Sequence, residues 1–389
     1  MIGSKTTRRR VLYPKLLFRI LLELVSSTNC QGYCHALVNV FSQLKCLERV
    51  IAKSALTKMR SRVSYQFFQA LFEKLIHIHD PDRQTYRGLR VYAVDGAELA
   101  IPRSQDTLSA GYDGRALVKK KKTYHPHMYL THAYDVFSGV TKKLLFGPNR
   151  QELLDALDII PSLEKMSLCL YDRLFMSKVL IKAHAEHGSY FLCRIKTNAF
   201  KVVQEFSKSN RRIRTVTICG EKIRLFKIRI PKTSEYALFA TNITHCWMDS
   251  KTVFNLYSLR WQVENSFRDT NCSLKIKQWH SKSLNGVLQE LFCTYWLMNF
   301  ARIQIAASNV NPSHLLNSEY EKPNFKLILN WIIKRFPQSL RVCISVEREL
   351  EFLINYSTEK RRRNSRHYPR QIKSSRRFYK RACAIERSA

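Results

Sequence analysis

Apolar residues recur at helical spacing over the first 80 residues of the chain. In two stretches, residues 16–24 and 67–75, leucine, isoleucine and phenylalanine stand three or four positions apart, as one face of an amphipathic helix requires. A short basic segment, residues 52–62, lies between them. This pattern predicts an N-terminal helical domain over residues 1–85.

The pattern changes at about residue 88, where β-branched and aromatic residues become frequent. Residues 89–100, 128–137 and 140–146 predict three strands joined as a meander. A helix, a strand, a second helix that ends at a glycine and a further strand follow, at residues 150–160, 166–171, 177–187 and 190–195. Strands followed by alternating strands and helices predict an α/β fold with a ribonuclease-H-like core, whose first part spans residues 86–199.

Residues 200–250 interrupt that core with three alternating runs, which predict an inserted β subdomain. A helix over residues 257–270 then returns to the core, and we expect the second part of the core over residues 251–310. The remaining residues, 311–389, are expected to form a C-terminal helical region and a basic C-terminal tail.

The net charge is +36 over 389 residues, far more than solubility requires, and it indicates a polyanionic partner. Nucleic acid is favoured over a membrane, because charged residues interrupt the two most apolar segments before they reach the length of about 20 residues that a membrane span needs. The first residues do not follow the pattern of a secretory signal. We therefore expect the protein in the bacterial cytoplasm, associated with the nucleoid.

Eleven cysteines are scattered along the chain, often in apolar runs, as expected for reduced core thiols. Cys30, Cys34 and His35, and separately His125 and His127, come closest to a zinc pattern. Neither group has a partner pair at the spacing of structural zinc sites. A glycine-rich phosphate loop is also absent from the sequence, which argues against a nucleotide-driven motor or kinase.

Two basic segments are candidates for DNA contact. Arg60 and Arg62 lie in the segment over residues 52–62, and residues 360–381 carry many lysines and arginines with almost no acid. Such segments often form a solvated face or a disordered tail. A net charge of this size favours contact with DNA phosphates, so we expect Arg60, Arg62 and the tail to bind DNA.

Three acidic residues suit a metal site. Asp95 and Asp172 each follow an apolar strand-like run, and Glu264 lies on the helix expected over residues 257–270, on the same side as Tyr257 and Arg260. Hard Mg²⁺ or Mn²⁺ prefers oxygen ligands and keeps positions open for water and phosphate. Two such ions activate the nucleophile and stabilise the leaving oxygen in phosphodiester cleavage.

Each of these acids also has an ordinary structural interpretation. An aspartate at a strand end often caps a helix or a turn, and Glu264 could pair with an arginine of its own helix. On residue type alone, three other acids could replace any member of the set; they are Glu98, Asp135 and Asp155. Glu98 is the strongest rival, because it lies close to Asp95 on the same extended segment.

Residues 257–271 hold the most specific pattern of the chain. Tyr257, Arg260 and Glu264 match the first three positions of the motif Tyr-x2-Arg-x3-Glu-x6-Lys, which surrounds the last catalytic acid of DDE transposases from bacterial insertion sequences. Val94-Asp95-Gly96 and Tyr171-Asp172-Arg173-Leu174-Phe175 look like the first and second acidic blocks of that family. The chain therefore resembles the IS four-like group of DDE transposases, from residues 54–72 through residues 280–283.

This resemblance implies a ribonuclease-H-like core with a β insertion between the second aspartate and the glutamate. It implies that Asp95, Asp172 and Glu264 are the catalytic acids and hold Mg²⁺ or Mn²⁺, ahead of their rivals. It also implies that Tyr257 and Arg260 contact DNA, and that two copies of the chain form a homodimer in the synaptic complex.

The chain departs from the family motif at two positions. Asn271 stands where the motif has a lysine that contacts DNA near the cut, and Leu174 stands where a glycine is usual. Arg268 and Lys275 flank Asn271 on the expected helix face, so either could supply the missing positive charge. Arg268 is the stronger candidate, because it lies one turn from Glu264.

The expected function is that of a transposase, which binds terminal inverted repeats, cleaves DNA with a divalent metal and joins 3′ hydroxyl ends to target DNA. Two alternatives stay open. A catalytically impaired remnant would bind DNA without cutting it, as the substitution at Asn271 suggests. A ribonuclease-H-like nuclease would cut DNA without strand transfer.

Overall fold

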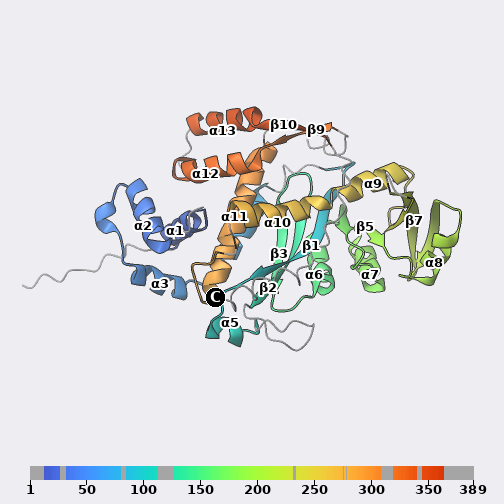
Figure 1. Ribbon diagram of the computed structural model, residues 1–389, viewed down its shortest axis with the longest axis horizontal. Helices are drawn as coiled ribbons and strands as arrows, with labels where there is room; N and C mark the ends of the chain where they lie inside the picture. Colours follow the sequence, from blue (N-terminus) through green and yellow to red (C-terminus); the bar gives the residue numbers. More distant parts are fainter. Residues whose placement is uncertain are drawn as a thin grey trace, which may run out of the picture.

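The computed structural model shows a mixed α/β protein built around one large sheet, with helices on its faces and at one end (Figure 1). It describes residues 13–26, 32–79, 85–112, 126–230, 234–274, 276, 278–307, 319–339 and 344–362. Several residues named above lie outside these ranges: Cys30, His125, Lys275 and the basic tail beyond Arg362. None of the helices within these ranges is long and apolar enough to cross a membrane.

Eight strands of the described chain form the main sheet, in the order β3-β2-β1-β4-β5-β8-β7-β6. The strands β1, β2 and β3 form an antiparallel meander, β4 and β5 run parallel to β1, and β8, β7 and β6 continue the sheet in antiparallel fashion. Their bounds are Arg90–Ala100 (β1), His127–Asp135 (β2), Thr141–Gly147 (β3), Ser167–Tyr171 (β4), Tyr190–Ile195 (β5), Ile213–Ile218 (β6), Glu221–Arg229 (β7) and Tyr236–Thr241 (β8). The predicted meander and the two strands after it are confirmed.

Helices cover one face of this sheet through the side chains of Tyr92, Tyr171 and their neighbours. These helices are α6 (Glu152–Ile159), α7 (Lys178–His187) and α8 (Lys201–Lys208). The hydroxyl of Ser177 accepts a hydrogen bond from the Leu180 amide at the start of α7, which satisfies a donor that the helix itself leaves unpaired. Gly188 ends α7 with a φ of 74°, a conformation that glycine adopts at little cost.

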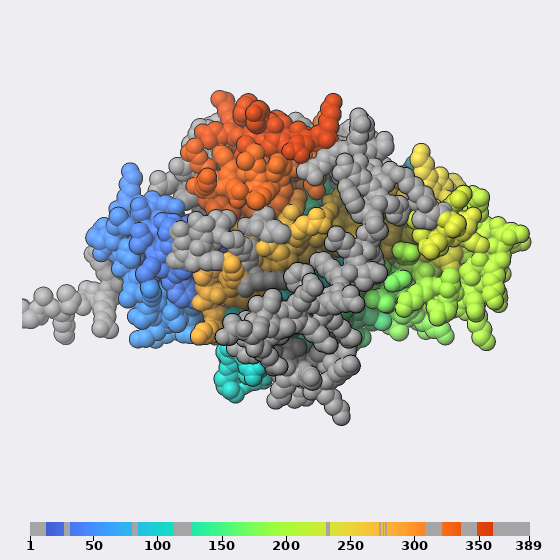
Figure 2. All heavy atoms as spheres, viewed as in Figure 1, coloured from blue at the N-terminus to red at the C-terminus, as the bar shows by residue number. Residues whose placement is uncertain are grey.

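The region over residues 200–250, predicted as an inserted β subdomain, forms strands that continue the main sheet. Its strands β6, β7 and β8 do form, but β8 pairs with β5 of the core, so all three extend the main sheet. Leu238 and Ala240 of β8 join the same buried cluster as Tyr171 and Cys193. Figure 2 shows this region at one end of the molecule, in green and yellow. The alternating pattern correctly indicated strands and carried no information on their partners.

The helix expected over residues 257–270 is two helices. The first, α9, ends early (Ser250–Ser258), and α10 (Trp261–Ser273) follows after a two-residue turn at Leu259 and Arg260. The turn contains neither glycine nor proline, which explains why the sequence pattern did not show it. Tyr257 and Glu264 therefore belong to different helices, with Arg260 at the junction.

Helices from both ends of the chain share one hydrophobic core. Buried residues of α1, α2, α3 and α4 belong to the same cluster as those of α11, α12 and α13. The bounds are α1 (Pro14–Ser26), α2 (Gly32–Gln43), α3 (Lys53–Arg62), α4 (Tyr65–His79), α11 (Leu284–Ala307), α12 (Phe325–Ser339) and α13 (Ile344–Tyr356). Short elements complete the described chain: η1 (Leu47–Arg49), α5 (Gln105–Ser109), η3 (Ile160–Ser162), and the paired strands β9 (Glu319–Pro323) and β10 (Thr358–Arg362).

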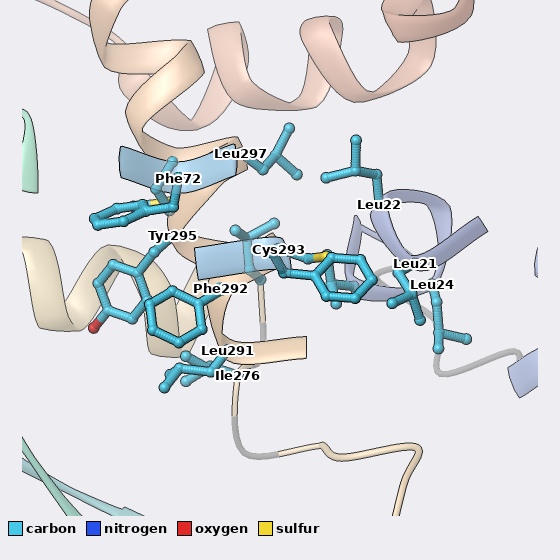
Figure 3. Close-up of a cluster of buried hydrophobic side chains, with 14 of the residues drawn as sticks. Leu21, Leu22, Leu24, Phe72, Ile276, Leu291, Phe292, Cys293, Tyr295 and Leu297 are labelled. Carbon is cyan, nitrogen blue, oxygen red and sulfur yellow. The ribbon is translucent and has the colours of Figure 1, made fainter. Parts of the chain in front are cut away.

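The centre of this shared core lies along α11. Figure 3 shows Leu21 and Leu22 of α1 beside Cys293 and Leu297 of α11, and the ring of Phe72 from α4 lies 5.9 Å from that of Phe292. The N-terminal helices predicted over residues 1–85 are confirmed as helices. They do not have a core of their own, because their buried residues belong to one cluster with residues of α11, α12 and α13.

Candidate active site

The parallel pairing of β1 and β4 brings Asp95 and Asp172 together. Val94 is paired with Tyr171, so each aspartate stands one residue beyond a paired position on neighbouring strands, which lie about 4.8 Å apart in a sheet. Alternation places both on the face opposite Val94 and Tyr171, the face that carries α9 and α10. Two acids 77 positions apart in the sequence thus lie on neighbouring strands and on the same face of the sheet.

Arg260 connects the first aspartate to the glutamate. Its Nη1 donates a hydrogen bond of 2.9 Å to Asp95 Oδ2, and its Nη2 donates one of 2.9 Å to Glu264 Oε1. The arginine side chain is only 7% exposed, whereas that of Glu264 is 38% exposed. Asp95, Arg260 and Glu264 therefore form one ionic cluster between β1 and the start of α10.

A pocket of about 450 Å³ opens beside this cluster. The pocket is lined by two of the three candidate acids, Asp172 and Glu264, together with Tyr257 and Arg260. Three residues that the sequence did not single out complete the lining: Arg173, Arg194 and Trp261. The pocket combines two carboxylates with three arginines and two aromatic rings, a composition suited to a phosphate-bearing ligand.

The pairing of the strands also explains the position of Arg194 beside the acids. Tyr171 is paired with Cys193 on β5, so Arg194 neighbours Asp172 just as Asp172 neighbours Asp95. The thiol of Cys193 donates to the Asp172 carbonyl oxygen at 3.3 Å. An arginine near the end of an otherwise apolar strand was the signal in the sequence that could have identified this residue.

Burial changes the proton affinity of two groups here. Desolvation raises the pKa of Asp95 to about 6, against the attraction of Arg260 and a hydrogen bond from the Gly96 amide, with Glu152 and Glu264 adding to the rise. Desolvation also raises the pKa of Tyr257 above its ordinary value, opposed by Arg260. The Tyr257 phenol is therefore neutral at physiological pH, and the Asp95 carboxylate is charged at some cost.

The donor set suits a hard divalent cation. Carboxylate oxygens are the ligands that Mg²⁺ and Mn²⁺ prefer, and the space between Asp95 and Glu264 already holds a positive charge, the Arg260 guanidinium. Among the described residues, no group of three or more histidine, cysteine, aspartate or glutamate side chains lies close enough to hold a metal ion. The chemistry of the three acids therefore fits a metal. In this structure Arg260 pairs with two of them, Asp95 and Glu264.

The rival acids have structural partners elsewhere. Glu98 pairs with His127 at 3.4 Å. Asp135 accepts hydrogen bonds from the amides of the turn after β2, and Asp155 is buried and accepts a hydrogen bond of 2.5 Å from Thr131. None of the three lines the pocket beside Arg260.

Arg60 does not lie on the surface, and its burial argues against the expected contact with DNA. Its guanidinium is buried in the protein and uses four of its five N–H donors on Gln289, Tyr33, the Gly286 carbonyl and Glu290. The sequence placed Arg60 in a basic segment and gave no sign of a buried acid on α11. Arg62 is exposed on the same helix, and its contact with DNA stays a prediction.

The positions around Asn271 lie partly within the described chain. The helix α10 extends to Ser273, so Asn271 shares a helix with Glu264 and Arg268, as expected. Arg268 is exposed, and the Asn271 side-chain oxygen is buried and has no hydrogen-bond partner within the described part of the chain. Lys275, the weaker candidate for the missing charge, lies outside the described residues.

Comparisons with known proteins relate this chain to transposases. Six chains of solved structures match; one belongs to a piggyBac transposase synaptic complex with hairpin DNA, is 12% identical, covers 92% of this chain and 78% of that chain, and has a TM-score of 0.47. No curated protein matches. Residues 86–300, more than half of the chain and the part that holds all three acids, match the family model described as the transposase DDE domain. The chain belongs to the DDE transposase family.

Proposed function

We propose that this chain is a transposase that binds terminal inverted repeats, cleaves DNA with bound Mg²⁺ or Mn²⁺ and joins the freed 3′ hydroxyl ends to target DNA. The observation that carries the proposal is the convergence of Asp95, Asp172 and Glu264 beside a pocket lined by arginines. This arrangement lies within the residues that match the family. The chain is placed in the IS four-like group on the spacing of Tyr257, Arg260 and Glu264.

In this proposal Asp95, Asp172 and Glu264 hold the metal. When bound, the metal would activate the attacking oxygen and stabilise the leaving oxygen of the phosphodiester. Arg173 and Arg194 attract and orient the DNA phosphate in the pocket. The neutral Tyr257 phenol donates a hydrogen bond to the phosphate, and the half-exposed Trp261 ring offers a surface for a base or sugar.

The fold supports a ribonuclease-H-like core as part of the proposal. The first five strands have the order β3-β2-β1-β4-β5, with β2 antiparallel to its neighbours. Asp95 lies within β1, and Asp172 directly follows the neighbouring parallel strand β4. We assign the core to residues 86–199 and 251–310, with β6 to β8 as an insertion that enlarges the sheet. A homodimer in the synaptic complex belongs to the same proposal.

The test is a cleavage assay on a supercoiled plasmid that carries the terminal repeats. Wild-type protein with Mg²⁺ should release the element and yield joined products on an added target plasmid. Asp172→Asn should abolish cleavage and leave repeat binding, measured by gel shift, nearly unchanged, because it removes a metal ligand and no phosphate contact. Asp95→Asn and Glu264→Gln should behave alike.

The control variant is Glu98→Ala, which removes an acid of β1 that pairs with His127 outside the pocket; its cleavage should stay near the wild-type rate. Cleavage without joined products would identify a nuclease that lacks strand transfer. Repeat binding without any cleavage would identify an impaired remnant. Near wild-type cutting by any one of the three acid variants would remove that residue from the site.

A further inference from the structure

Arg260 occupies the space between two acids that the proposed chemistry requires. Its two terminal nitrogens reach Asp95 and Glu264 at 2.9 Å each. The third nitrogen, Nε, is buried and has no hydrogen-bond partner among the residues that the structure describes. The planar guanidinium thus satisfies one oxygen of each carboxylate, as a cation placed between them would.

The same side chain also borders the pocket. Arg260 lines the pocket with Arg173 and Arg194, and its guanidinium carbon lies 5.2 Å from the centre of the Trp261 ring. It stands in the two-residue turn between α9 and α10. A phosphate in the pocket would therefore compete with the two carboxylates for the donors of Arg260.

We propose that Arg260 is a built-in counter-cation that keeps divalent metal out of the site until a DNA phosphate draws its guanidinium toward the pocket. Metal loading then depends on DNA. Without DNA, Arg260 is paired with both carboxylates and offsets one of their two negative charges; with DNA, both carboxylates are released together. This inference rests on the proposed function, because it takes the three acids as the metal ligands. It adds an order of binding to that function.

If the ion pairs of Arg260 have only a structural role, the effect of its removal on metal affinity should be the opposite. If Arg260 only holds Asp95 and Glu264 in position, removing it disorders the ligands and weakens metal binding. If Arg260 competes with the metal, removing it strengthens metal binding in the absence of DNA. Metal affinity measured without DNA therefore separates the two roles.

The experiment is a titration of the full-length protein with Mn²⁺ alone, in which free Mn²⁺ is followed by electron paramagnetic resonance. Arg260→Gln should bind Mn²⁺ at least about tenfold more tightly than wild type, since hydrogen bonds between charged groups are among the strongest in proteins. The matched control is Arg194→Gln, which removes the same charge from the same pocket and has no ion pair to these acids among the described contacts. The Mn²⁺ affinity of Arg194→Gln should exceed that of wild type by less than about threefold, and this increase measures the general effect of removing a positive charge. An Arg260→Gln affinity equal to or below that of Arg194→Gln overturns the proposal.

Two further measurements protect against a variant that does not fold. Arg260→Lys keeps the charge, but one ammonium group cannot reproduce the two-sided contact of a guanidinium, so its affinity for Mn²⁺ should lie between those of wild type and Arg260→Gln. In wild type, adding a duplex of the terminal repeat should raise Mn²⁺ affinity about tenfold after correction for Mn²⁺ bound by DNA alone. Equal affinity with and without the duplex overturns the proposal without any variant.

Failure of the proposed function gives a different result. An inactive wild type whose Mn²⁺ affinity still rises on Arg260→Gln would mean that the acids bind metal under the control of Arg260 and that transposition is the wrong activity. Cleavage by wild type, combined with unchanged Mn²⁺ affinity in Arg260→Gln, would keep the function and remove the counter-cation role.

Discussion

Arg60 on α3 and Glu290 on α11 form a buried ion pair of 2.8 Å, with side chains 4% and 3% exposed. Three further hydrogen bonds hold the guanidinium, from its nitrogens to Gln289, Tyr33 and the Gly286 carbonyl. The other Glu290 oxygen accepts a hydrogen bond from the His280 amide. This network joins α3 to α11 and to His280, which lies in the segment between α10 and α11. It therefore links the N-terminal helices to the part of the chain that follows the helix with Glu264.

Arg60→Ala should destabilise the protein by about 3–5 kcal/mol, because it leaves the Glu290 charge buried and unpaired. Urea denaturation monitored by circular dichroism measures this loss. The matched variant is Arg62→Ala, an exposed arginine on the same helix, which should change stability by less than about 0.5 kcal/mol. If Arg62 contacts DNA, Arg62→Ala should also reduce the slope of log DNA affinity against log salt concentration by about one unit. Equal stability losses would contradict the assignment of Arg60 as structural.

Arg194→Ala should slow DNA cleavage on the order of a hundredfold, because it removes a positive charge next to Asp172 in the pocket. Its melting temperature should stay close to that of wild type. Lys222→Ala removes the same charge from an exposed position on β7 and should cleave normally. A cleavage rate for Arg194→Ala that matches Lys222→Ala would exclude Arg194 from the site.

The raised pKa of Asp95 predicts a pH-dependent stability. In the folded protein the carboxyl titrates at about 6, above its ordinary value of 3.8, so the folded state binds the proton more tightly than the unfolded state. The stability linked to this group is therefore fully present below about pH 4 and is lost as the pH rises through 6. Asp95→Asn, which mimics the neutral carboxyl, should melt a few degrees above wild type at pH 8 and show a smaller difference at pH 5. The same difference at both values would show that Asp95 does not titrate in this range.

Arg268→Ala should reduce both cleavage and repeat binding if this exposed arginine supplies the charge that Asn271 lacks. Asn271→Lys should preserve or raise activity, because it restores a cation seven residues beyond Glu264 on the same helix. Cleavage rates and gel-shift affinities of both variants measure the effect. A neutral Arg268→Ala together with a strong gain from Asn271→Lys would mean that no other residue substitutes for the missing lysine.

Local elements of this fold could be predicted from the sequence, because their signals are local. The strands β1 to β5 follow apolar runs, and α7 begins at Ser177 and ends at Gly188 as its capping residues predict. Asp95 and Asp172 were found because an acid directly after an apolar strand is visible in the sequence. Their roles as metal ligands stay predictions.

The errors concern partners far away in the chain. The ion pair of Arg60 depends on an acid 230 positions later, and the pairing of β8 with β5 depends on which sheet edge is free. The break between α9 and α10 has no local breaker; it coincides with the point where Arg260 reaches both Asp95 and Glu264. Hydrophobic periodicity carries none of this information.

The core shared by both ends of the chain constrains how the protein can fold during synthesis. Leu21 and Leu24 of α1 leave the ribosome early, yet α11, against which α1 packs, is made only after some 260 further residues. Contacts between residues so far apart in the sequence form late, and proteins that depend on them fold slowly. The first helices must therefore wait, with apolar surface uncovered, until nearly the whole chain exists, and a chain that stops before α11 would contain most of the sheet but no closed helical core.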